Sequence, residues 1–232
     1  MFFEKTLLRY FFSPPPPLAH PSSPLPFSEL AKVRASLAGL GDVAISFRRA
    51  LETGVSSLAA RLTPRLRTAL NVFEGAGALV QYELTEAAFA AAAGGNHAFA
   101  SEFLPVLAAM LAPLQYALTP SLSGALLLKV ATYIAKQLEP RVRRKRFNLL
   151  GGLLFEGDVR TLTQFFVLRA GRRARERFAR LSAIAALLAC ENKQEAADAA
   201  ERSAKGAQVG AAAARLSHED VAAVMRQRND WL

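Results

Sequence analysis

The sequence predicts an all-α fold, and three of its properties support this class. Residues that favour helices, chiefly Ala, Leu, Arg and Glu, dominate the 232 positions, whereas β-branched residues are sparse. Apolar residues recur at steps of three and four along several segments, which defines buried helix faces. Gly and Pro residues separate these segments at short intervals. We therefore expect an elongated multi-helix bundle whose antiparallel helices are joined by short connections.

The first helices can be placed from their start and stop signals. Ser28 is a suitable N-cap, and a break is possible near Gly39 and Gly41. Thr63-Pro64 is typical of a new helix start, because Pro is favoured at the first helical position. Gly94-Gly95 is expected to end the third segment. Up to residue 147 the predicted helices cover 28–62, 64–73, 82–93, 98–118 and 120–147.

The stretch between Glu102 and Lys129 contains no charged residue, and its length would allow a transmembrane helix. Thr119-Pro120 divides it, however, since this dipeptide again predicts a helix start. The leucines of the first half fall on one stripe instead of surrounding the helix. We therefore interpret the stretch as two core helices and not as a membrane span.

Residues 146–181 carry the strongest local signals. Gly151-Gly152 is predicted to form a turn between two helices, because adjacent glycines break helices readily. Asp158 is the expected N-cap of a helix over 158–170, and Gly171 is its natural C′ residue. A further helix is predicted over 172–191.

Arg180 lies close to the apolar face of this last helix, between Phe178 and Leu181. A buried arginine needs a carboxylate or carbonyl partner, because an unpaired buried charge costs several kcal/mol. Alternatively, the side chain extends along its own stem to water. The residue pattern leaves both interpretations open.

The chain is expected to divide into three parts. Residues 1–27 are Pro- and Ser-rich after a short apolar start, and we expect a disordered leader that serves as a spacer. A first helical bundle is expected at 28–149 and a C-terminal helical bundle at 150–232. Within the latter, residues 192–214 are Ala-rich with scattered charge, so they could be a weak helix or disordered.

The sequence offers no catalytic or metal centre. His20, His97 and His218 are scattered without a second ligand at metal spacing, and the single cysteine, Cys190, has no Cys or His neighbour. No nucleophile elbow, zincin helix or phosphate-binding loop is present. We therefore expect a protein that is not an enzyme and that uses no cofactor. One cysteine also excludes an internal disulfide, which favours a reducing, cytosol-facing location.

The net charge of +10 favours acidic partners, and the basic residues gather in two clusters. We expect either two solvated faces or one shared basic patch for anionic phospholipid or an acidic protein. Nucleic acid is not expected, because the aromatic residues that would stack on bases are missing. The first cluster is Arg141, Arg143, Arg144, Lys145 and Arg146. The second is Arg169, Arg172, Arg173, Arg175 and Arg177.

Residues Ser217 to Asp220 fit a capping box with Asp in place of the usual Glu, ahead of a short helix to about Arg228. Asp220 would then cap its own helix. The other possibility is that Asp220 or Glu219 reaches Arg180.

Several strings in this order resemble the C-terminal region of subunit 4 of the conserved oligomeric Golgi complex. They are YELTEAAF at 82–89, LTPSLSGALLLKVATYIAKQLE running into RRKRFNLLGGL at 118–153, LGGLLFEGDVRTL at 150–162, RERFARLSAIAALLACE at 175–191 and RLSHEDVAAVMRQRNDW at 215–231. The resemblance covers roughly residues 50–231, with its strongest part at 146–191.

This resemblance implies the helical-bundle architecture of vesicle-tethering complex subunits. It also implies a peripheral protein on the cytosolic face of the Golgi membrane that acts in retrograde transport within the Golgi. The implied partners are the other subunits of the complex, membrane-fusion proteins and the anionic membrane surface. In that family the Arg of the FARL motif pairs with the acid of the closing helix, and these are Arg180 and Asp220 here. Arg228 and Asp230 match the family's closing Arg and acid, whereas Ala214 stands where the family has Trp.

Overall fold

The computed structural model describes residues 27–74, 82–93, 98–205 and 216–231. The expected leader at 1–27 therefore lies outside the described residues, apart from Phe27. Residues 1–50 and 51–232 form two compact units. The boundary that we expected at 149–150 falls instead in the first turn of a helix within the second unit.

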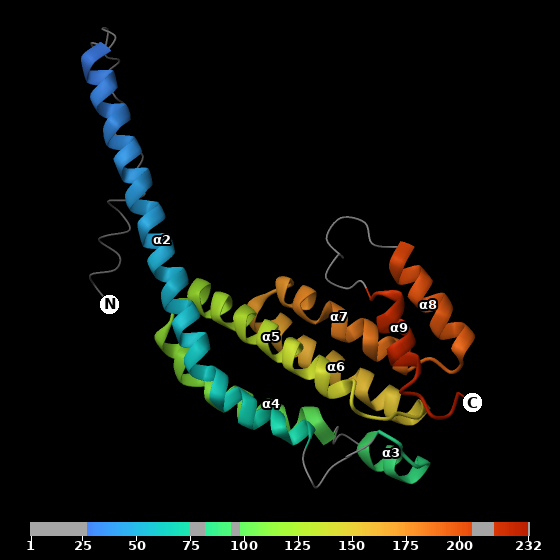
Figure 1. Cartoon of the computed structure of the whole chain (residues 1–232). Helices are drawn as coiled ribbons and strands as arrows, with labels where there is room; N and C mark the ends of the chain where they lie inside the picture. Colours follow the sequence, from blue (N-terminus) through green and yellow to red (C-terminus); the bar gives the residue numbers. More distant parts are fainter. Residues whose placement is uncertain (1–26, 75–81, 94–97, 206–215, 232) are drawn as a thin grey trace, which may run out of the picture. The chain divides into compact units, whose positions relative to one another are not determined.

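The all-α class is confirmed over the described residues, whose only β-type pairings are two isolated parallel bridges, Tyr82 with Phe147 and Phe147 with Arg228. The helices (Figure 1) are α2 (Phe27–Leu70), the short 3₁₀ helix η1 (Asn71–Phe73), α3 (Glu86–Ala93), α4 (Ala98–Ala117), α5 (Pro120–Val142), α6 (Leu149–Ala170), α7 (Arg173–Leu188), α8 (Lys193–Lys205) and α9 (His218–Met225).

Helices α5, α6 and α7 form the centre of the second unit, where they lie side by side (Figure 1). Each of the three presents an apolar face, and the shared core includes Leu138, Phe155, Phe166 and Phe178, all fully buried. Helix α9 packs on α7, and α4 packs on α6. This arrangement brings the C-terminal end of α5, the N-terminal end of α6 and the C-terminal end of α7 to the same end of the bundle.

One predicted helix boundary is wrong near Pro64. Helix α2 continues through this residue to Leu70 and does not restart there. Pro64 cannot donate to the carbonyl of Ala60, but Ala60 is exposed, so water can satisfy that carbonyl. Thr63 does not cap a new helix either, because its hydroxyl donates to the Ala59 carbonyl 3.1 Å away.

The glycine pair and Asp158 were also interpreted wrongly. Gly151 and Gly152 lie inside the first turn of α6, and Asp158 lies in the interior of the same helix, fully buried. The N-cap of α6 is Asn148, whose Oδ1 accepts from the Gly151 N–H at 2.9 Å. The sequence therefore has one 22-residue helix where we expected a turn and a shorter helix.

Tyr82 to Thr85 are not helical, although we expected a helix from residue 82. The Tyr82 N–H donates to the Arg146 carbonyl and the Asn148 N–H donates to the Tyr82 carbonyl, which holds this segment extended beside residues 146–148. Helix α5 correspondingly stops at Val142 instead of 147. In the Ala-rich stretch, α8 occupies Lys193–Lys205, while 206–214, including Ala214, lie outside the described residues.

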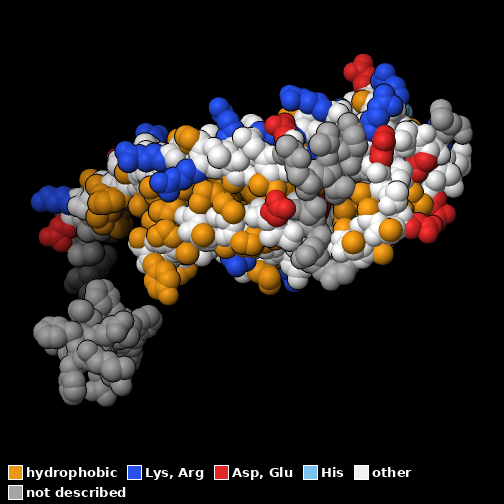
Figure 2. Space-filling view, turned by 90° about the horizontal axis from the view of Figure 1, so that it is seen from below, with side chains coloured by type: hydrophobic (Ala, Val, Ile, Leu, Met, Phe, Trp, Pro, Cys, Tyr) orange, Lys and Arg blue, Asp and Glu red, His pale blue; other side chains and the backbone are white. Residues whose placement is uncertain are grey.

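Helix α4 has one buried face, formed by Phe103, Leu107 and Leu111, and one exposed face that includes Val106 and Tyr116. By length and composition alone, Phe99–Ala117 could cross a membrane, but core helices also meet this criterion. Thr119 is extended and Pro120 takes the first helical position of α5, as the Thr-Pro dipeptide predicts. On the face seen from below, hydrophobic side chains are grouped, with Lys and Arg mostly along its edges (Figure 2).

Candidate functional site

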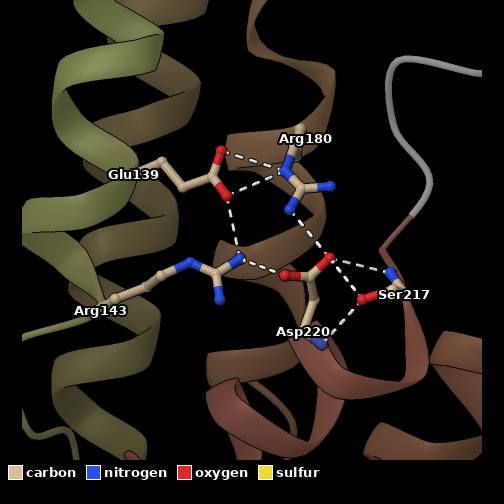
Figure 3. Close-up of polar contacts among 5 residues, drawn as sticks. All are labelled: Glu139, Arg143, Arg180, Ser217 and Asp220. Atoms are coloured by element: carbon tan, nitrogen blue, oxygen red, sulfur yellow. Dashed lines mark hydrogen bonds and ion pairs between the residues drawn. The ribbon is translucent and has the colours of Figure 1, made fainter.

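Four charged side chains, from α5, its C-cap residue Arg143, α7 and α9, meet where α9 packs on the bundle (Figure 3). On the acceptor side, Glu139 of α5 accepts from Arg180 Nε at 2.9 and 3.0 Å and from Arg143 Nη2 at 2.9 Å. Asp220 of α9 accepts from Arg180 Nη2 at 2.9 Å and from Arg143 Nη2 at 2.6 Å. Two acids therefore balance two arginines, and the cluster joins α5, α7 and α9.

Asp220 also starts its own helix. The Ser217 N–H donates to Asp220 Oδ2 at 2.9 Å, and the Asp220 N–H donates to Ser217 Oγ at 3.1 Å, which completes a capping box. One carboxylate thus caps α9 and binds both arginines. The two roles that the sequence left as alternatives are combined in a single side chain.

The electrostatics of the cluster depend on partial burial. The side chain of Asp220 is 18% exposed and that of Arg180 is 34% exposed, so water screens the pair only in part. Burial raises the pKa of Asp220, but hydrogen bonds from the Ser217 N–H, Arg143, the Ser217 hydroxyl and Arg180 outweigh it and hold that pKa well below its usual range. Asp220 is therefore charged at all ordinary pH values.

Arg228 forms a second, more deeply buried contact with the end of the bundle. Its side chain is 1% exposed, and Nη1 donates to the carbonyls of Leu188 and Cys190, both at 2.6 Å. Nε pairs with Asp230 at 2.7 Å, and the guanidinium lies 4.3 Å from the ring centroid of Trp231. Arg228 thus satisfies carbonyls at the C-terminal end of α7, where a positive charge is favourable.

The residues around Arg228 bind the ends of the neighbouring helices. Asp230 Oδ2 accepts from the Leu149 N–H at the start of α6, at 2.8 Å. Gln227 Nε2 donates to the carbonyls of Val142 and Lys145 at the end of α5, at 2.7 and 2.9 Å. Residues 227–231 therefore connect the ends of α5, α6 and α7.

Sequence reasoning from residue types alone missed Glu139 and Gln227 in these contacts. Glu139 resembles any exposed helical acid, and its one available signal is the i, i+4 spacing to Arg143. Gln227 has no such signal. The family resemblance singled out Arg228 and Asp230, but it did not predict that they pair with each other.

The two glycines at the start of α6 are required by close packing, not by a turn. A Cβ at Gly151 would lie 1.7 Å from the Tyr82 carbonyl oxygen, and one at Gly152 would lie 2.0 Å from that of Leu188. Both glycines have ordinary helical backbone angles, since Gly171 is the only described glycine with positive φ. Their absent side chains let the start of α6 contact the 82–85 segment and the end of α7.

Asp158 connects α6 to the start of α4. Its Oδ1 accepts from the Ala100 N–H at 3.1 Å, in the first turn of α4. Burial raises the pKa of Asp158 to about 7, although hydrogen bonds from the Ala100 N–H and the Tyr82 hydroxyl lower it. Asp158 Oδ2 has no hydrogen-bond partner within the described part of the chain. The carboxyl group therefore keeps its proton well above the pH at which an exposed Asp loses it.

Much of the first basic cluster takes part in internal contacts. Arg141 pairs with Glu74 at 3.2 Å, and Arg143 belongs to the charge cluster above. Lys145 is buried, with Nζ 4.8 Å from the ring centroid of Phe73, and burial lowers its pKa against the opposing effect of Glu74. Arg144 and Arg146 are exposed, and Arg144 Nη1 lies 3.8 Å from Glu74 Oε1.

The second basic cluster lies elsewhere. Arg172, Arg173, Arg175 and Arg177 are exposed around the start of α7, and Arg169 covers the ring of Phe165 at 3.8 Å. The two clusters occupy opposite ends of α6, which at 22 residues is roughly 33 Å long. The structure therefore does not bring them into one shared patch.

The reactive side-chain types do not converge in the described residues. No group of three His, Cys, Asp or Glu in this part of the chain is placed to hold a metal ion. Cys190 is buried and its thiol donates to the Ala186 carbonyl at 3.3 Å. The contacts made by Arg180, Asp220 and Arg228 join helices to one another.

Comparison with known proteins identifies the chain's relatives. Residues 7–223 match the family described as "Conserved oligomeric Golgi complex subunit 4, C-terminal". The chain is 32% identical over 167 residues to conserved oligomeric Golgi complex subunit 4 of Arabidopsis thaliana, a match that covers 72% of this chain and 22% of the plant protein. The corresponding Bos taurus protein is 28% identical over 202 residues, covering 87% of this chain and 24% of its own length. The chain thus spans less than a quarter of these relatives.

Proposed function

Since the chain belongs to the family formed by the C-terminal region of conserved oligomeric Golgi complex subunit 4, we propose that it acts as a non-enzymatic helical scaffold of that complex. The match over residues 7–223 is the observation that carries this proposal. The partners would be the other subunits of the complex. The finer role would be vesicle tethering in retrograde transport within the Golgi, on the cytosolic face of its membrane.

The contacts at the C-terminal end support a scaffold whose helices are held firmly together. A tether must transmit position between partners, so its helices should not slide or detach. Arg180 and Asp220 join α7 to α9, and Arg228 joins the segment after α9 to the end of α7. We propose that these contacts lock the terminal helix onto the bundle.

The proposal is tested by recovering a tagged full-length chain from the cells that make it. Mass spectrometry of the recovered material should find the other subunits of the Golgi complex, and the tagged chain should colocalise with a Golgi marker. Recovery of none of those subunits would refute membership of the complex.

Membrane binding without a tethering complex is the second candidate, because Arg172, Arg173, Arg175 and Arg177 are exposed at one end of the bundle. Flotation of the purified chain with vesicles that contain phosphatidylserine would support it, if binding disappears with neutral vesicles. Failure to float with either vesicle type would exclude it.

A further inference from the structure

A groove of about 660 Å³ follows the surface between α6 and α7, and neither Arg180 nor Asp220 lines it. Apart from Arg175 at one end, the α7 wall consists of small side chains on one face of the helix, namely Ala179, Ser182 and Ala185. The α6 wall is longer, and its apolar residues are Val159, Val167 and Leu168. Because the α7 side chains are small, the two helices leave a hollow that their own side chains do not fill.

The apolar side chains of the α6 wall are only partly buried by the chain itself. Val159 is buried, whereas Leu168 is 74% exposed at one end of the groove. Most of the Leu168 side chain lies in water beside an unfilled hollow. Removing this apolar surface from water would favour the binding of a partner there.

The end of the groove near Leu168 is strongly positive. Arg175 lines it, and Arg172, the N-cap residue of α7, precedes Arg175 by three residues, a spacing that makes residues of a helix neighbours. In the described part of the chain, no acidic side chain forms a salt bridge with either arginine. The start of α7 also carries the positive end of the helix dipole, where basic residues are unfavourable, and Glu176 is the one acidic residue in the first turn of this helix.

The opposite end of the groove is nearly neutral. Arg160 there pairs with Glu156 of the same helix at 2.7 Å. Positive charge is therefore concentrated at one end of the groove, so a partner with negative charge at one end would bind in a single orientation.

We propose that this groove is a docking site for an amphipathic helix of a partner protein, whose apolar face fills the hollow and whose acidic residues bind Arg172 and Arg175. The lining of α6 extends from Glu156 to Leu168, which corresponds to roughly 18 Å, or about three helical turns. Such a helix would anchor through apolar residues at i, i+3 or i+4, and i+7. Its acidic residues would lie at the end that meets the start of α7.

A helix fits this surface better than a membrane does. A lipid surface is broad and flat, so binding to it would not need the hollow that the small side chains of α7 leave. The groove instead selects a rod-shaped occupant and distinguishes Arg175, which lines it, from Arg177, which does not. This distinction provides the test.

The probe is a fluorescein-labelled synthetic peptide of about 14 residues, with Leu at i, i+4, i+7 and i+11, Ala between them and three Glu at one end. Its binding to the full chain is measured by fluorescence anisotropy. We expect saturable binding that Arg175→Glu weakens roughly tenfold or more, because one attractive contact becomes repulsive. Arg177→Glu makes the same charge change on the opposite side of α7 and should leave the affinity unchanged.

The apolar part of the site has its own pair of variants. Leu168→Gln should weaken peptide binding, whereas Leu153→Gln, at another exposed leucine of α6 outside the groove, should not. Circular dichroism checks that all four variants keep the helical content of the parent chain.

Three results would overturn the proposal: no saturable binding of the acidic peptide, equal losses for Arg175→Glu and Arg177→Glu, or equal affinity for a peptide with Lys in place of Glu. Equal losses accompanied by flotation with phosphatidylserine vesicles would assign the arginines to a lipid surface instead. The peptide experiment uses no other subunit, so its failure is distinguishable from failure of the proposed function.

Discussion

Gly152 in the first turn of α6 packs directly against the carbonyl group of Leu188 at the end of α7. A Cβ at Gly152 would lie only 2.0 Å from that carbonyl oxygen. The same oxygen accepts a hydrogen bond from buried Arg228 at 2.6 Å. One carbonyl thus connects the glycine that permits close packing of α6 and α7 with the arginine that holds the C-terminal segment.

Replacing Gly152 by Ala should therefore destabilise the second unit, because the neighbouring atom is backbone and cannot rotate away. We expect a loss of at least about 2 kcal/mol in the free energy of unfolding, measured by urea denaturation. Gly124 of α5 is the matched control, since a Cβ there meets nothing within 4 Å. Gly124→Ala should stabilise the chain by up to about 1 kcal/mol. Similar effects of the two substitutions would contradict the packing argument.

Asp158 should make stability fall as pH rises. Its pKa is raised from 3.8 to about 7 in the folded chain, so the folded state binds the extra proton between these values. The contribution is complete below about pH 4 and is lost as pH rises through 7, with a total of as much as about 4 kcal/mol. Asp158→Asn should remove this slope, whereas Glu102→Gln, at an exposed acid of α4, should keep it. The test compares the urea denaturation midpoints of the parent chain and the two variants between pH 5 and 8.5. Equal slopes for the parent chain and Asp158→Asn would contradict this prediction.

Asp220 should act with the opposite sign. Because its pKa is held below the usual range, its contribution is present above about pH 4 and is lost only as pH falls further. Asp220→Asn should therefore destabilise the chain at pH 7 and lose that effect in strong acid. A constant difference between variant and parent from pH 7 to pH 2 would show that the carboxylate charge is unimportant.

The Arg180–Asp220 pair should show coupling in a double-mutant cycle. Arg180→Met and Asp220→Asn each break other contacts of the cluster, so only the cycle isolates the pair. We expect a coupling of about 1 kcal/mol, since both side chains are partly exposed. The exposed pair Arg160 and Glu156 should give about 0.5 kcal/mol or less. A coupling energy no larger than that of the exposed pair would contradict the claim that the Arg180–Asp220 pair holds α9 on the bundle.

Replacing Arg228 by Lys, which keeps the positive charge but changes the shape of the side chain, should destabilise the chain. Lys cannot reach both carbonyls and Asp230 together, because it lacks the planar guanidinium. Arg228→Lys should cost about 2–4 kcal/mol in urea denaturation, whereas Arg226→Lys, at an exposed neighbour, should stay within about 0.5 kcal/mol. Equal, small losses would mean that the buried contacts of Arg228 contribute little.

Composition and apolar periodicity were sufficient to predict the all-α class and the two helices on either side of Thr119-Pro120, α4 and α5. These signals are local, since one helix face repeats every three to four residues. The capping box of Ser217 and Asp220 could be predicted for the same reason, because this motif spans only four residues.

Interpretation of Gly151, Gly152 and Asp158 was wrong because their role depends on distant segments. Adjacent glycines are ambiguous: they permit a turn, but they also permit close approach inside a helix. Which of the two applies depends on the positions of the Tyr82 and Leu188 carbonyl groups, and these cannot be predicted from the local sequence around the glycines. Asp158 likewise caps a helix, but the helix is α4 and not its own.

The central claim is that the Arg180–Asp220 cluster fastens α9 to the bundle. Amide hydrogen exchange of residues 218–225, compared between the parent chain, Arg180→Met and Arg177→Met, tests it most directly. The account predicts faster exchange of α9 in Arg180→Met only, with protection of α5 and α6 retained. Unchanged exchange of α9 in Arg180→Met would contradict it.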